Sequence, residues 1–260
     1  MTDTPAYKLD PAPKGEHVVD GPVRIERDSL GEKAVPVDAY WGIHTERALE
    51  NFPITGRSIS VYSDLVDALA VVKQAAARAN KEIGALDPEK ADLIEHVCRR
   101  IRAGELHDQF KVGVIQGGAG TSTNMNTNEV IANACLVEMG HAKGDYQHLH
   151  PIDDVNRSQS TNDTYPTSIK VAMAFTLRRM LAELRLLIGA FDAKGVEFQD
   201  VLKVGRTQLQ DAVPMTLGQE FRGFAVILQE DHDRLDETIR LLLEVNLGAT
   251  AIGTGITADP

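Results

Sequence analysis

Two long stretches in the second half of the sequence carry apolar residues at the spacing of helices that pack along a bundle. From Pro166 to Phe191 the apolar side chains recur at alternating intervals of four and three residues, which is typical of long packed helices. The second stretch opens with Thr216-x-x-Gln219, a capping box that predicts a helix start. Two amphipathic helices cannot bury each other's apolar faces completely. The chain is therefore predicted to be mainly α, with helix faces covered by further chain or by further subunits.

Shorter elements surround these two helices. The Asp87-Pro88 pair is an N-cap followed by proline at the first helical position, and it predicts a helix start. The segment from Lys203 to Met215 contains Gly205 and Pro214 and is predicted to be an extended connector. Apolar periodicity and stop residues predict three helices in the first half of the chain, over residues 63–84, 88–104 and 125–139.

Changes in composition divide the chain into three parts. Residues 1–22 hold four prolines among polar residues without periodicity, which is typical of a flexible arm. Residues 23–162 mix short extended stretches with helices and are predicted to form a small mixed domain. Residues 163–260 are predicted to form the first part of a long-helix bundle domain that further sequence would complete.

The charge balance excludes several classes of partner. The chain has 38 acidic and 27 basic residues and a net charge of −11, whereas a nucleic-acid or anionic-membrane surface calls for clustered Lys and Arg. No run of eighteen apolar residues and no signal sequence is found, so we expect a cytoplasmic protein without a membrane span. Cys98 and Cys135 are interpreted as buried hydrophobic residues in a reducing compartment and not as a disulfide.

A glycine-rich stretch, Gly117–Gly120, leads directly into Thr121 and a predicted helix. A phosphate-binding P-loop would need Gly-Lys-[Ser/Thr] at its end, but Thr121 follows Gly120 here. The dinucleotide-binding pattern would need a third glycine where Thr123 stands. What remains is a loop that aims backbone N–H groups and hydroxyls into a helix N-terminus, a good place for a carboxylate. A capped helix with a flexible lead-in is the alternative interpretation.

A second polar stretch, residues 156–163, stands just ahead of the long helix at Pro166. Ser160, Thr161 and Asn162 place hydroxyl and amide groups at another helix start. Ordinary N-capping is the alternative, because these residue types favour caps. Six polar residues in succession exceed what one cap requires, so the stretch is interpreted as a ligand site.

A third polar stretch lies in the extended connector. Thr207 and Gln208 offer uncharged hydrogen-bond donors there, although from this segment alone a structural crossover between helices is the preferred interpretation. His148 and His150, with Asp153 and Asp154, match no strong metal-ligand spacing, so a solvated loop is the preferred interpretation. The sequence predicts neither a metal site nor a cofactor, and it lacks the Gly-x-Ser-x-Gly elbow of serine hydrolases.

Taken together, these segments resemble the aspartase/fumarase superfamily. The stretch 38–52, beginning Asp-Ala-Tyr-Trp-Gly, looks like the N-terminal motif of that family. Residues 118–130, 158–163 and 205–211 look like its three substrate-binding regions, in the right order. The resemblance implies that residues 23–162 form the N-terminal lyase domain. It also implies that four subunits pool their long helices in one bundle, with each active site built from three subunits.

The resemblance further implies an elimination reaction on a small dicarboxylate, giving fumarate. A base removes a proton next to a carboxylate, and fixed donors stabilise the enediolate-like dianion that results. By resemblance, the residues that bind the carboxylate and amino groups of the substrate are Thr121, Ser160, Thr161 and Asn162. Thr207 and Gln208 would contact the far carboxylate.

Two details bear on the leaving group and on the base. Fumarases of this family usually have His where this chain has Gln208, which favours ammonia release from L-aspartate. A fumarate hydratase and a non-catalytic bundle protein are the alternatives. The loop of the family that carries the serine base would lie beyond Pro260, so the chain contains no catalytic residue of that kind. The resemblance thus implies a carbon–nitrogen lyase whose 260 residues alone are inactive or nearly so.

Overall fold

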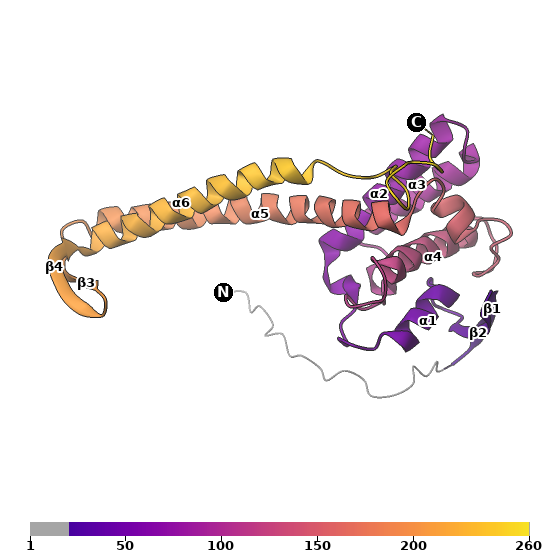
Figure 1. Ribbon diagram of the computed structural model, residues 1–260. Coiled ribbons are helices and arrows are strands. Elements are labelled where there is room, and N and C mark those ends of the chain that lie inside the picture. The colour runs from indigo at the N-terminus through magenta and orange to yellow at the C-terminus, as the bar shows by residue number, and fades with distance from the viewer. Residues whose placement is uncertain (1–20, 260) are drawn as a thin grey trace. The chain divides into compact units, whose positions relative to one another are not determined.

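The computed structural model describes residues 21–259, and nearly all of the predicted arm at 1–22 lies outside the described residues. The chain is mainly α, as predicted (Figure 1). It forms two compact units. One takes the described residues up to Ile169 together with the stretch that begins at Val245, and the other is Lys170–Glu244.

The first unit begins with a small antiparallel hairpin. Its strands β1 (Val23–Asp28) and β2 (Gly31–Pro36) pair with Val23 opposite Pro36 and Asp28 opposite Gly31. The helices that follow are α1 (Ile43–Asn51), α2 (Ser63–Glu82), α3 (Pro88–Arg102) and α4 (Thr121–Glu138), with short helical turns at Ile59–Val61, His107–Gln109 and Pro151–Val155.

Helices α2, α3 and α4 share one hydrophobic core. Leu69, Ile94 and Ile131, one from each helix, are completely buried in it. The predicted start of α3 is confirmed, because the Asp87 side chain accepts hydrogen bonds from the backbone N–H groups of Glu89 and Lys90. The core therefore places the N-terminus of α4 on a rigid support.

Helix α1 is held to α4 by a buried carboxylate. Glu129 of α4 accepts hydrogen bonds from the backbone N–H groups of Gly42, His44 and Thr45 at 2.9, 2.8 and 3.1 Å. Its Oε2 atom also accepts the Thr45 hydroxyl at 2.6 Å, and Glu26 accepts the remaining N–H, that of Ile43. Two carboxylates thus do for α1 what an N-cap side chain does for other helices.

Two helices begin earlier than predicted. Helix α4 begins at Thr121 instead of residue 125, because Gln116 accepts the N–H of Thr123 at 2.9 Å and satisfies the first turn. The long helix α5 (Thr161–Glu197) begins five residues before Pro166. Proline there leaves the carbonyl of Asn162 without its helical donor, and the side chain of Asn246 donates to that carbonyl at 3.1 Å instead.

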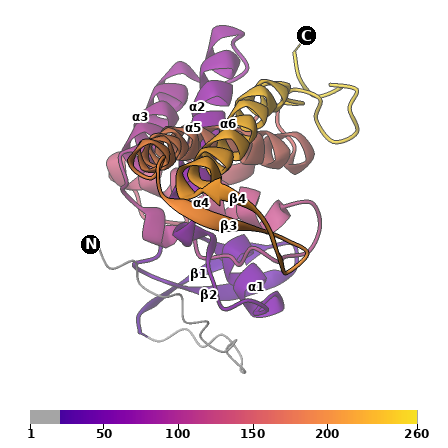
Figure 2. The same ribbon diagram turned by 90° about the vertical axis from the view of Figure 1, so that its left-hand side faces the viewer.

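The second unit consists of the rest of α5, a hairpin and the long helix α6. The strands β3 (Leu202–Thr207) and β4 (Gln210–Thr216) form the hairpin, and α6 spans Leu217–Leu242. Helices α5 and α6 run side by side (Figures 1 and 2), with the ring of Phe191 5.8 Å from that of Phe221. The predicted capping box of Thr216 and Gln219 is present at the start of α6.

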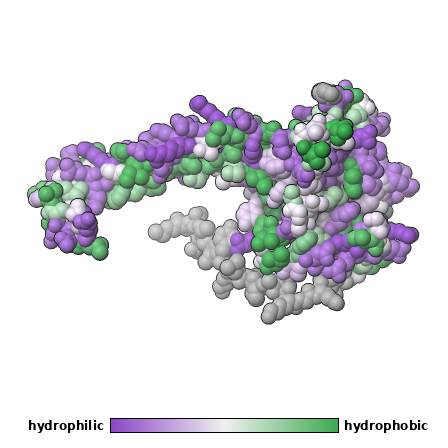
Figure 3. Space-filling view, viewed as in Figure 1, coloured by the Kyte–Doolittle hydropathy of each residue, from purple (hydrophilic) through white to green (hydrophobic). Residues whose placement is uncertain are grey.

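The paired helices leave much of their apolar surface open. Apolar residues appear along the length of this helical pair in Figure 3. Leu186 and Leu241 are each 69% exposed, and Val226 and Ile227 are each 59% exposed. The prediction that the two helices do not cover each other's faces therefore holds for the described residues. None of the described helices is long and apolar enough to cross a membrane.

Candidate active site

The N-termini of α4 and α5 lie next to each other in the first unit. The side-chain amide of Asn124, in the first turn of α4, donates to the hydroxyl oxygen of Thr161 at 3.1 Å. A Cβ atom on Gly120, which precedes α4, would lie 2.2 Å from the ring of Tyr165 in α5. Gly120 also has φ 93°, so both the contact and the backbone conformation require glycine. Two helix N-termini in contact concentrate partial positive charge, which favours a bound anion.

The structure places four of the predicted substrate-binding residues at these two helix starts. Thr121 is the first residue of α4 and is exposed, and Thr161 is the first residue of α5. The Ser160 hydroxyl oxygen accepts the N–H of Asn162 at 3.2 Å, and Asp163 accepts the N–H of Ser160 at 3.0 Å. Ser160 is therefore a helix cap, as the alternative interpretation held. Its hydroxyl proton can still be donated to a ligand.

A pocket separates the glycine-rich stretch from the first turns of α5. Its volume is about 570 Å³, large enough for a small dicarboxylate. The lining combines backbone of Gly118 and Gly120 with the side chains of Asn162 and Tyr165. Polar groups and helix N-termini thus meet at a cavity in the first unit.

The other two predicted residues, Thr207 and Gln208, lie in the second unit. The predicted extended connector is an antiparallel hairpin, with Thr207 at the end of β3 and Gln208 in its turn. Gln208 and Leu209 have φ values of 50° and 66°, the left-handed conformation that a two-residue hairpin turn demands. Side chains other than Gly, Asn and Asp adopt it at a cost of about 1–2 kcal/mol each. Such strain is typical of residues kept for function.

A buried polar network behind Thr161 was not predicted from the sequence. Lys73 of α2 is completely buried, and its ammonium nitrogen donates to the side-chain oxygens of Asn156 and Gln159 at 2.8 and 3.0 Å. Asn124 and Asn128 of α4 donate to the same Asn156 oxygen. The sequence feature that could have indicated this network is the position of Lys73, which falls on the apolar stripe of α2 four residues after Leu69.

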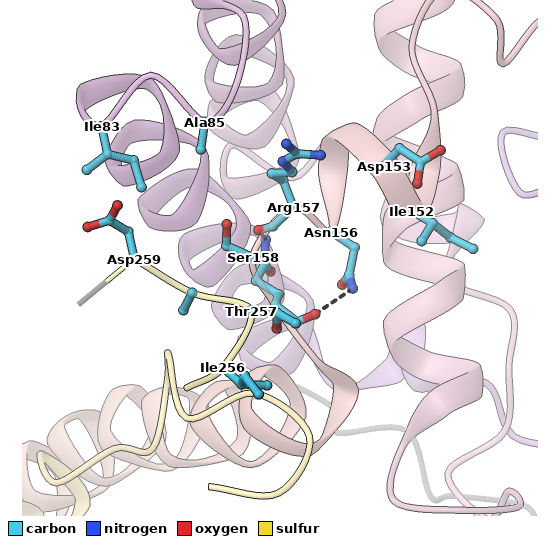
Figure 4. A pocket seen from close by; sticks show the side chains of 12 residues that line it. Ile83, Ala85, Ile152, Asp153, Asn156, Arg157, Ser158, Ile256, Thr257 and Asp259 are labelled. Atoms are coloured by element: carbon cyan, nitrogen blue, oxygen red, sulfur yellow. Dashed lines mark hydrogen bonds between the residues drawn. The ribbon is translucent and has the colours of Figure 1, made fainter. Parts of the chain in front are cut away.

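Asn156 and Gln159 also line a second pocket of about 730 Å³, shown in Figure 4. The amide of Asn156 donates to the backbone oxygen of Gln159 at 3.2 Å, which closes the turn between them. This turn leads directly into Ser160, so the buried network and the candidate substrate segment form one structure.

Within the described residues, the one group with the ligands for a metal ion is His141, Asp145 and His148. The two imidazole rings are stacked 3.7 Å apart with an angle of 6° between their planes. Parallel rings direct their nitrogen lone pairs side by side, whereas metal ligands converge on one point. His150 caps the helical turn Pro151–Val155, since its Nδ1 atom accepts the N–H groups of Ile152 and Asp153.

Comparisons with known proteins identify the family of the chain. A family model described as "Lyase" matches residues 31–260. The aspartate ammonia-lyases of Pseudomonas aeruginosa and Escherichia coli are 60% and 54% identical over 91% and 90% of the chain, which covers 50% and 49% of their lengths. The crystal structure of the fumarate lyase:delta crystallin of Brucella melitensis superposes with a TM-score of 0.88 at 54% identity, covering 91% of this chain and 52% of that one.

A class II fumarase from Schistosoma mansoni is more distant, with a TM-score of 0.85 at 35% identity over 92% of this chain and 50% of that one. The chain thus spans about half the length of the curated relatives it matches. Its fold agrees with those of the two solved structures over about half of their lengths. The chain belongs to the lyase family of the aspartase/fumarase superfamily.

Proposed function

We propose that the enzyme containing this chain eliminates ammonia from L-aspartate and releases fumarate. The observation that carries the proposal is the contact between the N-termini of α4 and α5, where Asn124 bonds Thr161. Gly120 and Asn162, which flank Thr121 and Thr161, line the cavity at this contact. Relatives named aspartate ammonia-lyase, at 54–60% identity, support ammonia as the leaving group. Gln208, where fumarases usually have His, supports the same choice.

The chemistry of the elimination matches these donors. Removing a proton next to a carboxylate moves negative charge onto that carboxylate, and the charge must be stabilised before ammonia leaves. Helix N-termini and hydroxyl protons that are already fixed in place provide this stabilisation without reorganisation. In the proposal, Thr121, Ser160, Thr161 and Asn162 bind this end of the substrate. Thr207 and Gln208 bind the far carboxylate.

The proposal takes the base and the subunit arrangement from the family. We place the proton-abstracting serine in sequence beyond residue 260, since the relatives are about twice as long as this chain. We also propose a homotetramer, in which long helices of four subunits cover the exposed faces of α5 and α6. Such an assembly would bring Thr207 and Gln208 of one subunit to the site of another.

An absorbance assay of fumarate tests the function. The protein to assay is an extended enzyme, in which residues 1–260 are joined to the sequence that follows the matched stretch in the Pseudomonas aeruginosa relative. We expect turnover of L-aspartate and none of L-malate. Turnover of malate alone would replace the proposal by a fumarate hydratase. Equal aspartate turnover by the 260-residue chain and the extended enzyme would show that the base lies within this chain.

Substituting Gln208→Gly should separate the backbone strain at this residue from the proposed role of its side chain in substrate binding. Glycine adopts the left-handed conformation freely, so the hairpin should gain about 1 kcal/mol of stability while the proposed contact with the far carboxylate is lost. We expect a higher thermal unfolding midpoint of the extended enzyme together with a raised KM for aspartate. Leu209→Gly is the matched control, because it relaxes the neighbouring strained residue, whose side chain is 96% exposed. An equal rise in KM in both variants would contradict a specific role for Gln208.

A further inference from the structure

The polar network around Lys73 has a composition that a structural core does not need. A lysine without any exposed surface is rare, and it normally pairs with a carboxylate. Lys73 instead donates to two neutral amide oxygens, those of Asn156 and Gln159. Asn124 and Asn128 bond Asn156 through their amide nitrogens, and their side-chain oxygens are buried without a hydrogen-bond partner. This arrangement is costly for stability and calls for a function.

The network ends at the candidate substrate segment. Asn156 and Gln159 are the two ends of the turn that precedes Ser160, and the amide of Asn124 bonds both Asn156 and Thr161. We propose that Lys73 positions the substrate-binding residues 160–162 through its two amide partners. The inference rests on the proposed function, and it makes Lys73 a positioning residue that does not touch the substrate itself.

The charge on Lys73 gives the inference a pH signature. Burial lowers the pKa of Lys73 to about 7, so its charge is lost as the pH rises through neutrality. The titratable groups that oppose this shift are Asp163 of α5 and Cys98 of α3. Burial raises the pKa of Cys98 to about 12, so the thiol is uncharged near neutral pH.

A charged ammonium makes stronger hydrogen bonds than a neutral amine, and its positive field favours an anionic substrate nearby. The affinity for substrate should therefore be highest below the pKa of Lys73. In the wild-type extended enzyme, KM for aspartate should rise as the pH passes about 7, while kcat changes less.

Lys73→Met is the direct test, with Lys81→Met as control on the same helix, where Lys81 pairs with Asp92 at the surface. We expect Lys73→Met to raise KM by about tenfold and to remove its dependence on pH across neutrality. Unchanged KM with an unchanged pH profile would overturn the inference. Because an apolar side chain in this network can disturb folding, circular dichroism must first show native helix content.

Gln159→Glu is the second variant and keeps the volume of the side chain. A carboxylate 3.0 Å from the ammonium would hold Lys73 in its charged form and raise its pKa. The rise in KM should then move to higher pH, a shift that a purely structural role for Lys73 would not produce. An unmoved pH profile in a folded Gln159→Glu enzyme would overturn the inference even if Lys73→Met fails to fold.

Hydrogen exchange separates this inference from the proposed function, because it needs no substrate. Backbone amides of residues 156–165 should exchange at least about tenfold faster in Lys73→Met than in Lys81→Met. Faster exchange in Lys73→Met, together with no aspartate turnover by the unsubstituted extended enzyme, would refute the function and support the positioning role. Equal exchange in the two variants would refute the positioning role, whichever substrate the enzyme uses.

Discussion

Thr161→Val should lower kcat/KM for L-aspartate by roughly 100-fold in the extended enzyme, the typical effect of removing one donor to a developing oxyanion. Its hydroxyl oxygen already accepts the Asn124 amide at 3.1 Å, which leaves the hydroxyl proton for a ligand at the junction of α4 and α5. Valine keeps the shape of the side chain and removes the hydroxyl, both the free proton and the oxygen that accepts from Asn124. Asn124 retains a second acceptor, the Asn156 side chain, so the helix junction should stay intact.

Steady-state kinetics with aspartate measures the effect. The control is Thr238→Val on α6, where the hydroxyl donates only to the carbonyl of Arg234 one turn earlier. It should change kcat/KM by less than about twofold, as surface substitutions usually do. If Thr161→Val retained wild-type activity, the junction of the two helices would not be the place where charge develops.

The sequence predicted helices well where capping and apolar periodicity agreed. The start of α3 at Asp87-Pro88 and that of α6 at Thr216 are both as expected, because the cap residues lie next to the apolar run. The starts of α4 and α5 were wrong because their first turns are polar and carry no periodic signal. Their N–H groups are satisfied from other segments, such as Gln116 for α4, and single-sequence patterns do not show such partners.

Some residues of the candidate site could likewise be predicted from the sequence, and others could not. Thr121, Ser160 and Thr161 were predicted because polar residues interrupt apolar patterns just before helices, and the structure brings their two segments together. Lys73 was missed because a single lysine within an apolar stripe is more often an exposed side chain at the edge of a helix face. Only the tertiary contacts of Asn156 and Gln159, more than eighty residues away in the chain, reveal its environment.

The sequence did not predict helix α1, and the buried carboxylate that holds it to α4 gives the second large expected effect, a loss of stability. Glu129→Leu should lower the free energy of unfolding of the first unit by about 3–5 kcal/mol, because each buried donor left without an acceptor costs roughly 1–3 kcal/mol. The substitution leaves three backbone N–H groups and the Thr45 hydroxyl buried without an acceptor. Water cannot easily replace the Glu129 carboxyl group as the acceptor, because this side chain is completely buried.

Urea unfolding followed by circular dichroism measures this loss, with Glu138→Leu as control at the exposed end of the same helix. Glu138 pairs with Arg100 at the surface, where such a bond contributes at most about 1 kcal/mol.

Burial raises the pKa of Glu129 to about 7 from a usual value of 4.5, so the folded chain keeps a proton that the unfolded chain releases. The stabilisation from this proton is complete below pH 4.5 and is lost as the pH rises to about 7. Wild-type stability should therefore fall over that range relative to Glu129→Leu, and parallel pH profiles would show that the carboxylate is ionised throughout.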